Sequence, residues 1–285
     1  MTSVFPDALV TTEWLEQHLS EPGLRILDCT WHHSSTNLDG RTQYRGRHLP
    51  GSVHFDIDHI ADKANPLPHM LPRATDFATR VGLLGIGRTD RVVVYDRMFG
   101  GSAAARVWWM FRVFGHDNVA LLDGGLTQWA KENRPTEMTA VRPEPNVFEA
   151  NFQPGLVRSL ADMRGNLVSG AEQVIDARGP GKFEGTQTDV FPFVRQGHMP
   201  NAINVPWADL VDPESGLFLS RDLQAARIAA AGIDLERPIV TTCASGITSC
   251  VVALALYRLG LRDVPVYDGS WAEWSLAEDT PAVAA

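Results

Sequence analysis

Cysteine is scarce in this chain, which has three cysteines among 285 residues: Cys29, Cys243 and Cys250. No two of them have the close C-x-x-C spacing of a zinc site or a dithiol redox motif. Three cysteines also provide no paired disulfide framework of the kind that supports small secreted domains. The sequence therefore predicts no structural metal and no disulfide scaffold, and it is typical of a reducing compartment.

Basic residues are also fewer than acidic ones. The chain has 25 Lys and Arg against 34 Asp and Glu, a formal net charge of −9 and a pI near 5.4. Nucleic-acid surfaces need clustered Lys and Arg, and no basic run occurs here, so we expect no nucleic-acid partner. No apolar stretch is long enough to span a bilayer, and residues 1–7 lack the features of a secretory signal. We expect a cytoplasmic protein without a membrane partner.

A long-period repeat is the most informative pattern that is present. Four motifs of the first half return in the same order in the second half, 145 to 150 residues later. This indicates a duplicated domain and not a short-period solenoid. The paired motifs are 26–28 with 174–176, 46–53 with 196–203, 92–96 with 239–243, and 122–129 with 267–274.

Each half alternates short β-rich runs with helical patterns, which predicts an α/β fold in which a parallel sheet has helices on both faces. A proline-rich stretch without a clear period separates the halves. We expect a first domain at 1–138, a linker at 139–156 and a second domain at 157–285. Strands are predicted at 25–28, 52–55, 91–96, 119–122, 173–176, 202–205, 238–242 and 264–267, and helices near 12–19, 74–81, 102–114, 127–131, 160–165, 222–231, 247–259 and 271–277.

Cys243 is the predicted nucleophile, because it lies between a strand-like run and a helix-like run. The backbone N–H groups of a tight loop and the positive end of a helix dipole both favour a thiolate. Asp96 occupies the same place in the first half, so we expect one active site per chain. Cys29 and Cys250 are predicted to be small buried hydrophobes.

The residues of this loop carry a family resemblance. The tandem repeat, the loop 243–248 (CASGIT), the ending 267–274 (YDGSWAEW) and the first-half runs 55–58, 69–72 and 106–112 resemble the two-domain rhodanese superfamily over almost the whole chain. The uncharged loop is similar to that of the 3-mercaptopyruvate sulfurtransferases, which read CGSGVT. It differs from that of the thiosulfate sulfurtransferases, which read CRKGVT.

The resemblance implies a sulfurtransferase without a metal or organic cofactor. A Cys243 thiolate would take the sulfane sulfur of 3-mercaptopyruvate, release pyruvate and hold the sulfur as a persulfide. The expected partners are this small-molecule donor and a thiol, cyanide or thioredoxin-like acceptor. Thiosulfate is the alternative donor.

The resemblance also implies further site residues. Ser245 would act with Asp58 and His69 of the first half in a proton relay, although the residues alone favour a turn cap at Asp58 and a loop histidine at His69. The loop positions Ala244, Gly246, Ile247 and Thr248 would bind substrate. Lys182 and Phe191 stand where the family has arginines, so Lys182 and the later Arg195 are predicted to anchor the substrate carboxylate.

Two other classes of protein remain as alternatives. Phosphatases that form a phosphocysteine use Cys-x5-Arg, but the sixth residue after Cys243 is Ser249, which argues against phosphoryl transfer. A non-catalytic binding module of the same fold is the second alternative, because fold does not determine activity. Thiol reactivity of Cys243 would distinguish a module from an enzyme.

Overall fold

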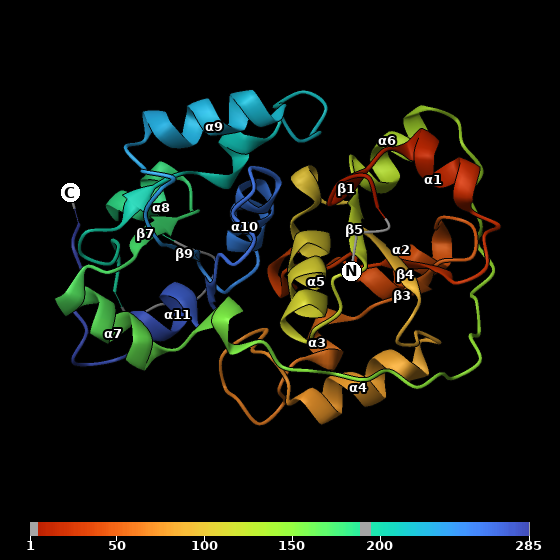
Figure 1. Ribbon diagram of the computed structural model, residues 1–285, viewed down its shortest axis with the longest axis horizontal. Coiled ribbons are helices and arrows are strands. Elements are labelled where there is room, and N and C mark those ends of the chain that lie inside the picture. Colours follow the sequence, from red (N-terminus) through yellow and green to blue (C-terminus); the bar gives the residue numbers. More distant parts are fainter. Residues whose placement is uncertain (1–4, 189–194, 285) are drawn as a thin grey trace. The chain divides into compact units, whose positions relative to one another are not determined.

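Two parallel sheets of five strands organise the part of the chain that the computed structural model describes, residues 5–188 and 195–284 (Figure 1). The strand order is β1-β5-β4-β2-β3 in the first sheet and β6-β10-β9-β7-β8 in the second. The identical order confirms the predicted α/β fold and the duplication. The strands are β1 (Leu9–Val10), β2 (Leu24–Asp28), β3 (Val53–His54), β4 (Arg91–Tyr95), β5 (Val119–Leu122), β6 (Val157–Arg158), β7 (Gln173–Asp176), β8 (Ile203–Asn204), β9 (Ile239–Thr242) and β10 (Val266–Tyr267).

Helices alternate with these strands, and several begin at a side chain that caps the first turn. Thr11 accepts a hydrogen bond from the Trp14 N–H. Ser159 forms a capping box with Asp162, in which the side chain of each residue accepts from the N–H of the other. The helices are α1 (Thr12–His18), α2 (Gly40–Gly46), α3 (Ile57–Ile60), α4 (Ala74–Leu83), α5 (Ser102–Val113), α6 (Gly125–Lys131), α7 (Leu160–Ser169), α8 (Pro180–Glu184), α9 (Arg221–Ala230), α10 (Ser249–Arg258) and α11 (Ser270–Trp274), with short 3-10 turns at Ser34–Thr36, Phe99–Gly101, Pro154–Leu156 and Trp207–Leu210.

Both faces of the second sheet are covered by helices. Alternate residues of β7 and β9 point to opposite faces, as a strand of period two requires. Ile175 and Ile239 pack in one core with Ile228 of α9 and Leu256 of α10. A second core lies on the opposite face of the sheet. It consists of buried residues of the sheet and of α7 and α11, namely Val174, Val240, Met163, Trp271 and Trp274.

The first sheet is covered in the same way. Leu15 of α1 and Trp129 of α6 pack against Val93 on one face. Every residue of α5 is buried, and its Phe111 meets Phe77 of α4 edge-on, with ring centroids 5.5 Å apart. The aromatic run in α5 therefore serves core packing.

The chain divides into two compact units, and each unit is made of more than one segment of the sequence. The first comprises the described parts of Met1–Lys63, Leu71–Gln153 and Ser215–Leu217; the second comprises Ala64–Met70 and the described parts of Pro154–Glu214 and Phe218–Ala285. The segment Ala64–Met70 thus belongs to the unit that contains Cys243. The predicted boundaries at 138 and 157 remain a prediction.

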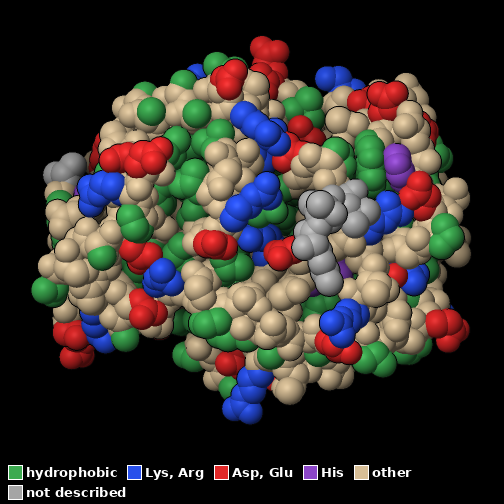
Figure 2. Space-filling model, viewed as in Figure 1, with side chains coloured by type: hydrophobic (Ala, Val, Ile, Leu, Met, Phe, Trp, Pro, Cys, Tyr) green, Lys and Arg blue, Asp and Glu red, His purple; other side chains and the backbone are tan. Residues whose placement is uncertain are grey.

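The surface agrees with the composition. Acidic and basic side chains are interspersed over the face shown in Figure 2. Among the described residues, no helix has the length and apolar character that crossing a bilayer requires.

Candidate active site

Strand β9 places Cys243 at the carboxyl end of the second sheet, directly before a loop and helix α10. All four strand residues are buried, and Cys243 is 1% exposed. The predicted strand-to-helix junction is therefore confirmed. Ligands of open parallel sheets bind at the carboxyl ends of strands, which is where this sulfur lies.

The loop after Cys243 turns back at Gly246, whose φ is +78°. Ser245 and Ile247 are buried, and the Cys250 thiol donates to the Gly246 carbonyl at 3.3 Å. Because the first N–H groups of a helix have no partner within the helix, the start of α10 and the loop amides favour an anion beside them. The structure thus brings the predicted residues 243–248 together in one short loop that suits a thiolate or a persulfide.

Helix α11 holds the base of this loop. The Trp271 N–H donates to the Cys243 carbonyl at 3.0 Å, and the Ala272 N–H donates to the Ala244 carbonyl at 2.9 Å. The Cys243 N–H in turn donates to the Ser270 hydroxyl at 3.3 Å. The backbone of Cys243 is therefore bound at both its N–H and its carbonyl.

The matching loop in the first half is occupied by a carboxylate. Asp96 accepts hydrogen bonds of 2.8 Å from the N–H groups of Met98 and Ala104. Burial raises the pKa of this carboxyl to about 7, although the backbone hydrogen bonds act in the opposite direction. The loop thus keeps its capacity to bind an anion but has no sulfur nucleophile.

The other two cysteines are buried, as predicted, and neither is in a disulfide. Burial raises the pKa of the Cys29 thiol well above its usual value, and the nearby Asp28 and Asp96 add to this effect. Such a thiol is a poor nucleophile. The structure therefore leaves Cys243 as the sulfur with the setting of an active site.

Asp58 and His69 lie in different units. Asp58, in α3, accepts a hydrogen bond of 2.7 Å from the Trp31 indole N–H, a partner that the sequence reasoning missed. His69 is buried and has a left-handed backbone with φ of +62°; it lies in the segment that belongs to the second unit with Cys243 and Ser245. The relay that the sequence predicts thus has two of its three members in one unit.

Lys182 lies in α8, the short helix that follows the carboxyl end of β7. Its side chain is partly exposed, which leaves a cation near the strand ends of the second sheet. The neighbouring Arg178 is buried and binds both carboxylate oxygens of Asp176 through Nε and Nη2, which makes a structural ion pair. Phe191 lies outside the described residues.

Arg195 has a different role from the one predicted. Its guanidinium donates to the carbonyl oxygens of Ser275 at 2.9 Å and of Trp274 and Ala277 at 2.7 Å, and it also binds Thr280. These bonds use Nε and both terminal nitrogens. Arg195 therefore holds the segment that follows α11, and we correct its assignment as a substrate ligand.

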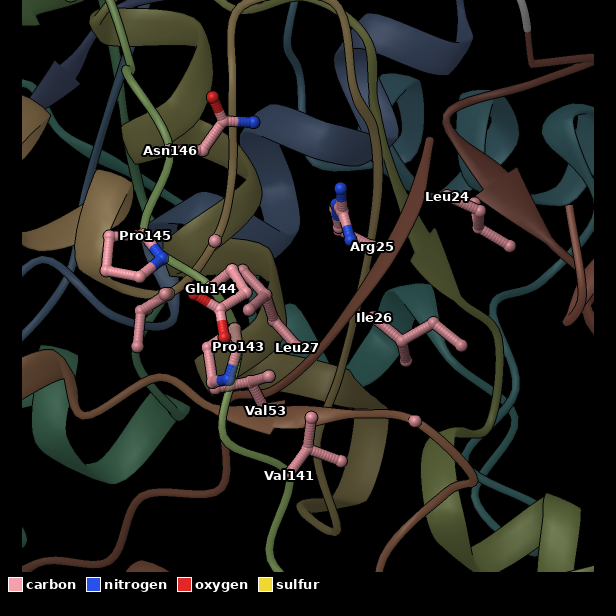
Figure 3. A pocket seen from close by; sticks show the side chains of 13 residues that line it. Leu24, Arg25, Ile26, Leu27, Val53, Val141, Pro143, Glu144, Pro145 and Asn146 are labelled. Atoms are coloured by element: carbon pink, nitrogen blue, oxygen red, sulfur yellow. The ribbon is translucent and has the colours of Figure 1, made fainter. Parts of the chain in front are cut away.

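A cavity of about 370 Å³ lies in the first unit, between β2 and residues 141–146 (Figure 3). Leu27, Val53, Val141 and Pro143 are among the residues that line it. Cys243 does not line this cavity. In residues 5–188 and 195–284, no group of three or more His, Cys, Asp or Glu side chains is arranged to hold a metal ion.

Comparison with known proteins agrees with the duplicated architecture. A family model described as a rhodanese-like domain matches residues 11–132 and 159–277. Human 3-mercaptopyruvate sulfurtransferase is 41% identical over 272 residues, 94% of this chain and 91% of the human protein. Bovine thiosulfate sulfurtransferase is 41% identical over 273 residues, with the same coverage of both chains.

A solved structure is similar over nearly the full length. The crystal structure of SseA from Escherichia coli, described as a 3-mercaptopyruvate sulfotransferase, has a TM-score of 0.85 and 35% sequence identity. The match covers 93% of this chain and 99% of the bacterial one. The arrangement of two repeated sheets is therefore shared with a protein whose described activity concerns sulfur transfer.

Proposed function

Because this chain belongs to the rhodanese-like family, with one copy of the domain in each half, we propose that it is a sulfurtransferase that carries sulfur as a persulfide on Cys243. The proposed donor is 3-mercaptopyruvate, and the alternative donor is thiosulfate. The position of Cys243 carries the proposal: it is a buried sulfur at the carboxyl end of β9, directly before a turn of backbone amides and the start of α10.

The first half-reaction forms the persulfide. The Cys243 thiolate attacks the sulfur of 3-mercaptopyruvate, a sulfur–sulfur bond forms and the carbon–sulfur bond breaks. The electron pair of the broken bond leaves with the carbon fragment as the enolate of pyruvate, which a proton converts to pyruvate. The loop amides and the hydroxyl groups of Ser245 and Thr248 stabilise the anionic sulfur before and after this step.

We assign the proton that the enolate takes up to a relay of Ser245, His69 and Asp58. A hydroxyl and an imidazole are suited to passing a proton, and a carboxylate orients the imidazole. Burial of Ser245 and His69 supports the assignment, because a relay works best where water does not compete. The indole N–H of Trp31 supports it further by fixing the orientation of the Asp58 carboxylate.

The second half-reaction restores the enzyme. A thiolate or cyanide attacks the outer sulfur of the persulfide, the sulfur–sulfur bond breaks and its electron pair returns to Cys243 as a thiolate. We propose a small thiol, cyanide or a thioredoxin-like dithiol protein as the acceptor, because each is a nucleophile for sulfane sulfur. No metal or organic cofactor is needed to balance either step.

The uncharged loop favours 3-mercaptopyruvate over thiosulfate as the donor. Ala244 and Ser245 put no cation beside the sulfur, whereas thiosulfate is a dianion that gains from cations at that place. Lys182 supplies one positive charge, which matches the single carboxylate of 3-mercaptopyruvate. Steady-state kinetics with each donor tests this preference. We expect the higher kcat/KM with 3-mercaptopyruvate, and a higher kcat/KM with thiosulfate would contradict the preference.

Mass spectrometry of the protein after incubation with each donor, without an acceptor, tests the persulfide. We expect one added sulfur atom on the peptide that contains Cys243, and its loss when cyanide is added. Cys243→Ala should take up no sulfur, while Cys29→Ala, which removes a buried cysteine of the first half, should behave as the wild type. A wild-type protein that takes up no sulfur and transfers none would contradict the proposal and favour a non-catalytic module.

We also propose that the protein works in the cytoplasm. Three cysteines that form no disulfide support a reducing compartment. Fractionation of cells that express the full chain would test this, and recovery in an organelle would contradict it.

A further inference from the structure

Ser270 has a backbone conformation that serine rarely adopts. It is the first residue of α11, it is fully buried, and its φ is +51°. This left-handed region disfavours residues that carry a Cβ, and glycine is the residue usually found there. We therefore expect the Ser270 side chain to make an interaction that glycine could not make.

The Ser270 hydroxyl connects α11 to the nucleophile. It donates to the Tyr267 carbonyl at 2.8 Å and accepts from the Cys243 N–H at 3.3 Å. Since the hydroxyl proton is committed to Tyr267, the lone pair that faces Cys243 is oriented. The buried Cys243 N–H thereby has an acceptor that does not belong to its own loop.

The first half shows the same position without a side chain. Gly125 also has a φ of +51°, and the residue after it, Leu126, donates to the Asp96 carbonyl at 3.0 Å, as Trp271 does to Cys243. A Cβ at Gly125 would lie 2.2 Å from the Asp96 carbonyl oxygen. Only glycine fits beside Asp96, whereas the half with the nucleophile accommodates a serine and uses its hydroxyl.

We infer that Ser270 is a positioning residue for Cys243. It fixes the backbone N–H of the nucleophile while Trp271 fixes the carbonyl, so that the loop amides converge on the sulfur. Its importance for turnover rests on the proposed sulfur transfer, but its effect on the reactivity of the Cys243 thiol does not. The sequence already held the signal, because the paired motifs place Ser270 opposite Gly125.

Ser52 provides a matched control. It is also a fully buried serine, and its hydroxyl donates at 2.8 Å to the carbonyl of Leu49, three residues earlier, as Ser270 does to Tyr267. Ser52 lies in the first half and has no bond to Cys243. Ser52→Ala therefore reproduces the loss of a buried hydroxyl without touching the nucleophile.

The experiment measures the rate at which iodoacetamide alkylates Cys243 across a range of pH, in the wild type, Ser270→Ala, Ser270→Gly and Ser52→Ala, with the modified peptide identified by mass spectrometry. We expect both Ser270 variants to react about tenfold more slowly than the wild type at neutral pH, the effect of losing one hydrogen bond. Ser52→Ala should keep the wild-type profile. Ser270→Gly suits the left-handed backbone and keeps the test valid if Ser270→Ala does not fold.

Two outcomes separate this inference from the proposed function. Altered alkylation in the Ser270 variants, with a wild type that forms no persulfide, would support the positioning role and overturn the sulfur transfer. Wild-type alkylation profiles in a folded Ser270→Gly protein would overturn the positioning role, whatever the wild type does with 3-mercaptopyruvate. In an active enzyme we expect kcat/KM to fall in parallel with the alkylation rate.

Discussion

The carbonyl oxygens of Asp96 and Cys243 accept equivalent hydrogen bonds of 3.0 Å, from the N–H groups of Leu126 and Trp271. The two residues directly follow equivalent strands, β4 and β9, so the backbone around them has been kept through the duplication. The two side chains interact differently with the loop that follows. Asp96 accepts from the N–H groups of Met98, in its own loop, and of Ala104, in the first turn of α5, whereas Cys243 places a sulfur there.

Asp96 should make stability depend on pH. Burial raises the pKa of its carboxyl from 3.8 to about 7, so the folded state holds the proton more tightly than the unfolded state. Its contribution is complete below the unfolded pKa and is lost as the pH rises through the folded one. Relative to the wild type, Asp96→Asn should therefore gain up to about 4 kcal/mol between about pH 4 and pH 8.

Urea unfolding of both proteins at a series of pH values measures this difference. Asp263→Asn removes an exposed carboxylate and is the control, whose profile should stay parallel to that of the wild type. Parallel profiles for Asp96→Asn as well would show that the buried carboxyl does not titrate in this range.

Asp58→Asn should affect the two donors differently. Pyruvate leaves as an enolate that needs a proton, whereas sulfite leaves thiosulfate as a stable anion. We expect kcat with 3-mercaptopyruvate to fall about 100-fold, the usual size of a general acid–base contribution, and kcat with thiosulfate to change little. Asp56, which caps the same helix α3 through the His59 N–H, supplies the control Asp56→Asn. Equal losses with both donors would remove Asp58 from the relay.

Lys182→Ala should raise KM for 3-mercaptopyruvate about tenfold with little change in kcat, because a charged hydrogen bond to the carboxylate is lost in the ground state and the transition state alike. Lys182→Arg should keep most of the affinity, since the positive charge remains. Lys131→Ala removes an exposed lysine of α6 and serves as the control. If Lys182→Ala has the wild-type KM, the carboxylate is bound elsewhere.

Arg195→Ala should lower stability and leave KM for either donor unchanged. Its guanidinium donates to the carbonyl oxygens of Trp274, Ser275 and Ala277, which would lose a charged donor. We expect the free energy of unfolding to fall by about 3 kcal/mol, measured by urea unfolding, and Arg195→Lys to recover part of it. A variant of wild-type stability with a raised KM would restore the substrate role that the sequence predicts.

Most of the sheet could be predicted from the sequence, and the errors have a physical reason. Arg91–Tyr95 and Ile239–Thr242 are apolar runs bounded by turn residues, and the structure places β4 and β9 there within one residue of the prediction. Leu9–Val10 and Val157–Arg158 form β1 and β6 but were missed. Two residues are too few to show the period of a strand, and these two become strands because a neighbour pairs with them.

The candidate site also has a part that the sequence predicts and a part that it does not. The loop at Cys243 was predictable because its residues are consecutive and follow an apolar run. The partners of Arg195 lie 79 to 85 residues away in the sequence, and no local pattern indicates which carbonyl groups a distant arginine will meet. A substrate role and a structural role for Arg195 look alike until those carbonyl groups are in place.

The sequence by itself determined the duplication and the parallel α/β architecture and predicted Cys243 as the nucleophile, because each depends on local composition or on a comparison of the chain with itself. Only the tertiary structure decided which groups surround that cysteine. It placed Ser270 against the Cys243 N–H, Arg195 against the segment after α11, and the segment that contains His69 in the second unit. The physical reason is that buried donors and acceptors must find partners wherever the fold brings them, and that pairing has no period along the chain.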